Sequence, residues 1–232
     1  LDWLLALEAD RMVNSNIARK DLDSEMTVVR NEMERGENEP GSVFQQRLRA
    51  AAYHWHNYGN STIGNRSDVE NVPIDRLQAF YRTWYQPDNA TVIVAGRFDP
   101  ERVLKSVQGS FGKLKRPTRA LPPHYTVEPV QDGEREINVR RVGDINLIGL
   151  TYHIPAATHP DNAALDVLAE VMGHTPSGRL HKALVESKLA VAGAAGSDSF
   201  RDPGLALFIG VPPKDGNPAE VEKVLLAQVE GL

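Results

Sequence analysis

The stretch DLDSEMTVVRNEMERGENEP, residues 21–40, carries the clearest structural pattern in the chain. Four apolar residues recur in it at helical spacing: Leu22, Met26, Val29 and Met33. This spacing predicts an amphipathic helix with one apolar stripe. Asp21 or Ser24 is suited to cap the start of the helix. Gly36 followed by Pro40 is suited to end it.

Two carboxylates in this stretch, Glu25 and Glu32, lie seven residues apart. Seven residues are close to two helical turns, so both side chains point the same way, about 10 Å apart along the axis. They flank the apolar stripe, where an acid must be paired, hydrogen-bonded or bound to a metal. The spacing alone leaves two interpretations open: metal-binding acids, or exposed helical acids that pair with Arg30 or Arg35.

Composition narrows the class of protein. The 232 residues are 41% hydrophobic and 25% charged, which is typical of a globular chain. A net charge of -5 without a compensating basic patch argues against nucleic-acid binding, and we interpret the basic cluster at 113–119 as a solvated linker. The absence of cysteine excludes disulfides and thiolate metal sites. No apolar run approaches the roughly 20 residues of a membrane span, and nothing assigns a cellular compartment.

The remaining pattern alternates helices and strands. Helices are predicted at 1–14, 41–55, 73–85, 100–111, 159–173, 177–188 (with Ser177 as its cap) and from Asn217 onward. Strands are predicted at 90–96, 136–142, 145–154, 189–200 and 204–213, with a hairpin around Gly143–Asp144. Residues 56–68 are predicted to form a loop. From residue 134 onward the order fits an α+β domain with helices on one face of a mainly antiparallel sheet.

The proline-rich stretch at 116–133 is predicted to be a linker between domains. Residues 1–115 would be the C-terminal part of a first domain, and residues 134–232 a second domain truncated at its C-terminus. Because the chain begins and ends within helical patterns, we expect it to be an internal fragment of a longer protein.

Several stretches resemble a known family. Glu25, six residues and then Glu32, within SEMTVVRNEMERGENEP, resemble the distal glutamate segment of the pitrilysin/insulinase-type zinc peptidases, the M16 family. HNYGNSTIG, FYRTWYQPDNATVIVAGRFDPERV, LTYHIPAATHPDNAALDVLAEVMG and SGRLHKALVESKLA resemble further segments of that family, in its order. The resemblance implies two consecutive α/β-sandwich-like domains, helices packed on mainly antiparallel sheets, with the first domain truncated.

The resemblance also implies a chemistry. Glu32 would be the third ligand of a catalytic Zn²⁺, and Glu25 a supporting acid. The intact protein would be a zinc metalloendopeptidase that hydrolyses peptides or small unfolded polypeptides, together with a second M16 half or a homologous subunit. A rival interpretation is a non-catalytic M16-like subunit that acts as a peptide-binding or structural partner. The plainest alternative is a structural α+β domain in which Glu32 is only a surface acid.

The chain departs from the family pattern in its histidines. None of the seven lies in an H-x-x-E-H motif, so two zinc ligands and the general base are expected to precede Leu1. We therefore expect the fragment alone neither to hold catalytic zinc nor to cleave peptides. His54 and His56 form an H-x-H pair, for which a structural role is favoured over metal binding. Arg179 is expected to form a salt bridge.

Overall fold

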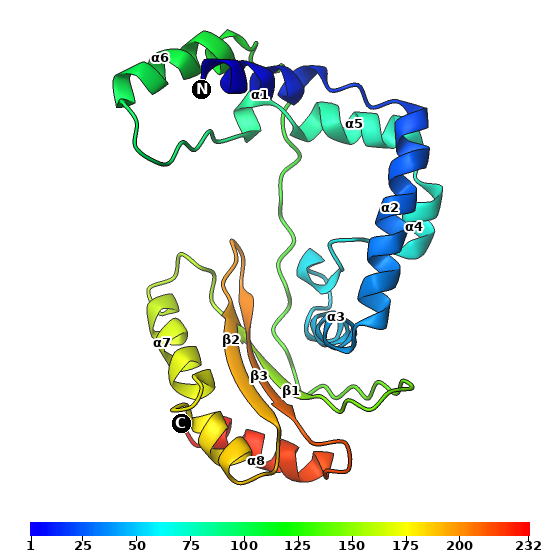
Figure 1. Ribbon diagram of the computed structural model, residues 1–232, viewed down its shortest axis with the longest axis vertical. Helices are drawn as coiled ribbons and strands as arrows, with labels where there is room; N and C mark the ends of the chain where they lie inside the picture. The colour runs from blue at the N-terminus through cyan, green and yellow to red at the C-terminus, as the bar shows by residue number, and fades with distance from the viewer. The chain divides into compact units, whose positions relative to one another are not determined.

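The computed structural model describes all residues, 1–232, which divide into two compact units (Figure 1). Unit 1 consists of Leu1–Glu34 and Ile63–Tyr125, and unit 2 of Arg35–Thr62 and Thr126–Leu232. Residues 35–62 thus pack in the same unit as 126–232, although they lie before the linker expected from the sequence. The domain boundaries at 115 and 134 stay a prediction.

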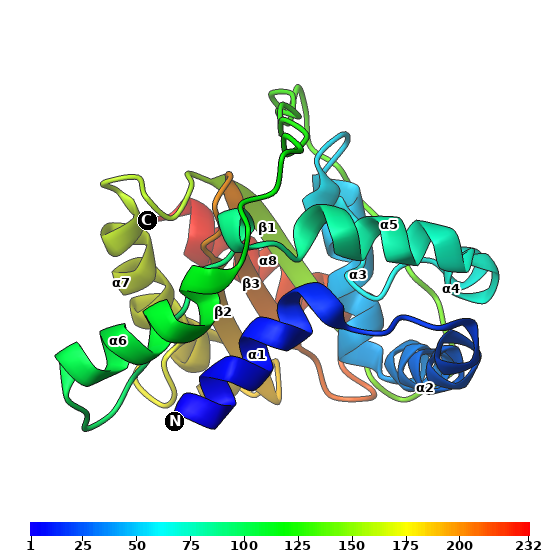
Figure 2. The same ribbon diagram turned by 90° about the horizontal axis from the view of Figure 1, so that it is seen from above.

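Unit 1 is built from helices. They are α1 (Asp2–Asn14), the first part of α2 (Arg19–Asn38), α4 (Arg66–Asn71), α5 (Ile74–Trp84) and α6 (Pro100–Ser110), with short 3-10 turns at Pro87–Asn89 and Phe111–Lys113. Helices α1 and α6 lie side by side (Figure 2). The Tyr81 hydroxyl donates to the Arg11 carbonyl oxygen at 2.8 Å and accepts from the Ser15 N–H at 3.0 Å, which fixes the end of α1 against α5.

Helix α2 confirms the helix predicted for residues 21–40. Leu22 and Met33 are buried, so the apolar stripe faces the interior as expected. The ends differ from the prediction: the helix begins at Arg19, and it continues through Gly36 to Asn38. The helix stops two residues before Pro40, which is the first residue of the next helix, α3 (Pro40–Ala52).

Two of the predicted strands are not strands in the structure. Residues 90–96 and 136–142 have no regular secondary structure, so the hairpin around Gly143–Asp144 is also absent. Ile93 is 82% exposed, and no strand lies in unit 1 to pair with its segment. The apolar pattern alone was insufficient because a strand requires hydrogen-bonding partners that local sequence does not supply.

Unit 2 is organised around a three-stranded antiparallel sheet. Its strands are β1 (Ile148–Ile154), β2 (Ala192–Asp198) and β3 (Gly204–Val211), in the order β1-β3-β2. In the register of the sheet, Phe208 lies opposite Leu150 on one side and Ala195 on the other. The α+β class with an antiparallel sheet is therefore confirmed.

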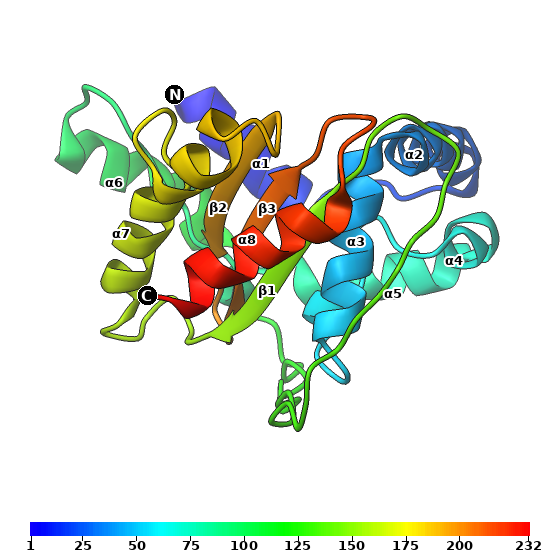
Figure 3. The same cartoon turned by 90° about the horizontal axis from the view of Figure 1, so that it is seen from below.

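One face of this sheet carries the main core. Helices α7 (Asn162–Gly173) and α8 (Pro218–Glu230) and a π-helical turn, His181–Glu186, pack on it (Figure 3). The core residues are Ile154, Met172, Leu180, Leu184, Ala190, Ala206, Phe208, Val221 and Leu225. The π turn lies within the helix expected at 177–188, but Ser177 bonds to the His174 ring at 2.9 Å and does not cap it.

Helix α3 packs against strand β1 in the same unit. Its start is capped by Glu39, whose carboxylate accepts from the N–H groups of Gly41 and Ser42. Its Phe44 ring occupies the space that a side chain at Gly149 of β1 would need. Its end, Ala52 with Tyr53, packs on Leu205 of β3 in a second, smaller cluster. No helix of the structure has the length and apolarity needed to cross a membrane.

Candidate functional site

Glu25 and Glu32 both lie on the part of α2 that belongs to unit 1, and both side chains are exposed. The uninterrupted helix between them keeps their backbones about two turns apart on one side of the axis. Their side chains flank the stripe that ends in the buried Leu22 and Met33. The structure thus retains the common direction expected from the sequence.

Two other acids near them on α2 have partners, whereas Glu25 and Glu32, like Asp21, do not. Asp23 accepts from Arg19 at 3.1 Å, and Glu34 accepts from Arg66 at 3.3 Å. Glu25 and Glu32 form no hydrogen bond or ion pair with the rest of the chain, so the alternative pairing of Glu32 with Arg30 or Arg35 is not found. Their carboxylate oxygens are therefore available to a ligand.

The availability of Glu32 fits one position of a zinc site. Zn²⁺ accepts carboxylate oxygen together with histidine nitrogen, and a helix holds such an oxygen in a fixed direction. No cluster of three metal-ligating side chains in the structure includes Glu25 or Glu32. The chain thus brings no other metal-ligating side chain to either glutamate, and the role of each stays a prediction.

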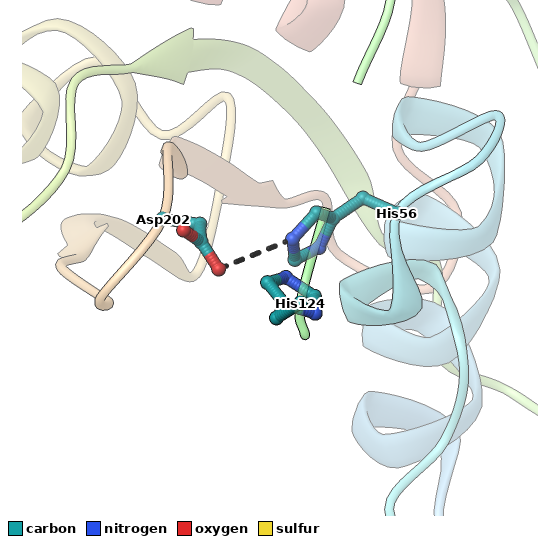
Figure 4. A group of neighbouring side chains, drawn as sticks. All are labelled: His56, His124 and Asp202. Atoms are coloured by element: carbon teal, nitrogen blue, oxygen red, sulfur yellow. Dashed lines mark ion pairs between the residues drawn. The ribbon is translucent and has the colours of Figure 1, made fainter. Parts of the chain in front are cut away.

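The loop after α3 contains the H-x-H pair, whose two members differ. The His56 ring is 6% exposed and its Nδ1 accepts from the Tyr58 N–H at 3.2 Å, while the His54 side chain is exposed. The Nε2 atom of His56 lies 3.4 Å from an Asp202 carboxylate oxygen (Figure 4). Packing of the His56 ring against the Tyr58 ring, with centroids 4.2 Å apart, gives His56 a structural role in unit 2.

The backbone of this loop is held by Glu128, a residue that the sequence analysis did not select. Its carboxylate accepts from the N–H groups of His54, Trp55 and His56 at 2.6, 2.9 and 2.9 Å. Partial burial acts to raise the pKa of Glu128, but the three donors and the nearby His153 outweigh it and lower the pKa below its usual value. No local pattern signals this contact, because it joins residues more than 70 positions apart.

Tyr53 ties the end of α3 to the sheet. Its hydroxyl donates to the Pro203 carbonyl oxygen at 3.1 Å, and its ring packs edge-on against the His153 ring. Burial, and after it the charge of Asp198, raises the pKa of Tyr53 to about 12. One turn earlier, Arg49 pairs with Asp198 of β2 at 2.7 Å. These long-range contacts were also beyond reach of the sequence pattern.

Arg179 does not behave as expected. Its side chain is half-buried, two residues before the π-helical turn His181–Glu186, and it forms no ion pair in the structure. The salt bridge predicted for it is therefore not found, since local sequence gave it no defined acidic partner.

Comparison with known proteins agrees with these features. Residues 71–232 match the family model described as Peptidase M16 inactive domain. The chain is 31% identical to the zinc protease PqqE of Helicobacter pylori, over all of this chain and 53% of that protein. It is 27% identical to an uncharacterized zinc protease of Mycobacterium leprae, again over all of this chain and 53% of the relative.

A solved structure extends the comparison. The crystal structure of a protease from Helicobacter pylori superposes with a TM-score of 0.94 at 30% identity, covering 99% of this chain and 56% of that one. The chain belongs to the M16 peptidase family. It spans about half the length of the relatives that it matches.

Proposed function

We propose that this chain is part of a zinc-dependent metalloendopeptidase, in which Glu32 supplies the third protein ligand of the metal. The observation that carries the proposal is the pair of exposed, unpartnered carboxylates, Glu25 and Glu32, on one side of α2. Family membership and the zinc-protease names of the relatives support it. The two further ligands and the general base would come from outside these residues, which contain no H-x-x-E-H motif.

Each glutamate has a distinct part in this proposal. Glu32 binds the metal through a carboxylate oxygen. Glu25, two turns earlier, orients a ligand histidine or holds a proton beside the metal. Zinc, when bound, polarises a peptide carbonyl and acidifies water. The buried stripe between Leu22 and Met33 keeps the helix, and with it Glu32, in a fixed direction.

The substrates in this proposal are peptides or small unfolded polypeptides, handled together with a second M16 half or a homologous subunit. Residues 71–232 contribute a chamber wall and no catalytic group, in keeping with their match to an inactive domain of the family. That match begins after Glu25 and Glu32, so it leaves the proposed role of α2 unaffected.

Hydrolysis of a quenched fluorescent peptide by the complete gene product tests the proposal. Glu32→Gln should abolish turnover, because the neutral amide is a poor zinc ligand, and Glu25→Gln should lower it. Glu34→Gln is the matched control: it lies on the same helix and loses only an exposed pair with Arg66. Full activity of Glu32→Gln would overturn the proposal.

A non-catalytic M16-like subunit is the second candidate, and the inactive-domain match over 71–232 is the observation that favours it. Such a subunit would bind peptide or a protein partner without turnover. A complete gene product that is inactive, free of zinc and still able to bind peptide would support this candidate over the first.

A further inference from the structure

Residues 126–135 of unit 2 form an extended segment that apolar burial does not hold in place. It has no regular secondary structure. Val127 is 76% exposed and Val130 is 92% exposed, so its two aliphatic side chains contribute little hydrophobic stabilisation. Its attachment to the rest of the unit must come from polar contacts.

The first such contact is an anion on a group of backbone donors. The Glu128 carboxylate accepts from three successive N–H groups, those of residues 54–56, at 2.6 to 2.9 Å. Consecutive N–H groups that converge on one point form a concave anion site. Hydrogen bonds to a charged acceptor are among the stronger ones in proteins.

The second contact has the opposite charge and lies at the adjoining end of α3. The Arg135 guanidinium donates to the carbonyl oxygens of Ala51 and Ala52 at 3.0 and 3.1 Å. These carbonyls are in the last turn of the helix, where they lack intrahelical partners and carry the negative end of the helix dipole. The cation and the anion of the segment therefore each meet backbone groups of complementary polarity.

We propose that residues 126–135, here called the strap, are fastened to the end of α3 by Glu128 and Arg135 alone, as a releasable element. In the same proposal the backbone of residues 54–56 is a carboxylate-binding site, for which Glu128 is the built-in ligand. The two statements are linked, because removal of the Glu128 carboxylate takes away one of the two fastenings of the strap and admits a carboxylate from solution.

Amide hydrogen exchange on the complete gene product tests the strap. Glu128→Gln should speed exchange at residues 54–56 by about tenfold, as expected for the loss of charge-assisted hydrogen bonds. It should also speed cleavage of the strap in limited proteolysis. Glu134→Gln, a charge-matched change in the strap, should leave these rates unaltered, and α7 should be unchanged in both variants. Unaltered exchange at 54–56 in Glu128→Gln, or faster exchange that includes α7, would refute the proposal.

Chemical rescue tests the carboxylate site separately. In Glu128→Ala, sodium acetate should restore slow exchange at residues 54–56 in a saturable manner, whereas sodium chloride at equal ionic strength should not. The strap, no longer linked to the bound anion, should stay as open to proteolysis as it is without acetate. Equal effects of acetate and chloride would show that residues 54–56 do not bind carboxylates. Restored resistance of the strap to proteolysis in acetate would show that Glu128 is not its fastener.

Discussion

The H-x-H pair offers a sharp test of the account, because His54 and His56 are chemically identical and placed differently. Replacing the buried His56 by alanine removes a ring that packs against Tyr58 and leaves the Tyr58 N–H without its acceptor. Loss of a buried ring costs about 3 kcal/mol or more, and an unsatisfied buried donor adds about 1 kcal/mol. Together these give an expected decrease of about 4 kcal/mol in the free energy of unfolding. His54→Ala should change stability by less than about 0.5 kcal/mol, since its side chain is exposed.

Urea unfolding followed by circular dichroism at neutral pH measures both changes. The measurement should be repeated with a metal chelator, which should leave the difference between the two variants unchanged. Equal destabilisation by His54→Ala and His56→Ala would refute the structural role assigned to His56. A chelator that lowers the stability of the wild type as much as His56→Ala does would refute it as well.

Three further predictions concern unit 2. Because the pKa of Glu128 is lowered in the folded state, its contribution to stability is present above the unfolded value of about 4.3 and is lost as pH falls through the folded pKa. The difference in urea midpoint between wild type and Glu128→Gln should therefore be largest at neutral pH and vanish in acid. A difference that stays constant with pH would contradict this. Leu184→Ala, at a fully buried position, should lower the free energy of unfolding by about 3 kcal/mol. The control Leu104→Ala, whose side chain is 58% exposed, should lower it by less than about 1 kcal/mol. Similar values for both would place Leu184 outside the core. Ultraviolet titration should show that Tyr53→Phe removes a tyrosine that ionises near pH 12, whereas loss of one that ionises near pH 10 would contradict its burial.

Local pattern was sufficient for most of the helices and for part of the sheet, but α4 begins within residues 56–68, which were predicted to form a loop. The stripe from Leu22 to Met33 needs only its own periodicity to identify α2, and the apolar runs of β1, β2 and β3 find partners in one another. The equally apolar run at 90–96 has no partner strand in unit 1, so the strand predicted from its sequence alone was wrong. Whether a segment forms a strand depends on the strands that pair with it, and the sequence of that segment does not identify them.

The candidate site likewise contains residues that local sequence could predict and residues that it could not. The common direction of Glu25 and Glu32 follows from helix geometry and could be predicted. Glu128 and Arg135 could not, because their partners are backbone groups at the end of α3, more than 70 residues away, and any exposed acid or base has the same local signature. Pairing across such distances arises from tertiary packing alone.

The zinc content of the complete gene product decides whether Glu32 is a metal ligand. Wild type, Glu32→Gln and the control Glu34→Gln should be purified alike and assayed by mass spectrometry of the metal. The account predicts about one zinc per chain in wild type and Glu34→Gln, and loss of that zinc in Glu32→Gln. Equal zinc in all three proteins would show that Glu32 is not a ligand.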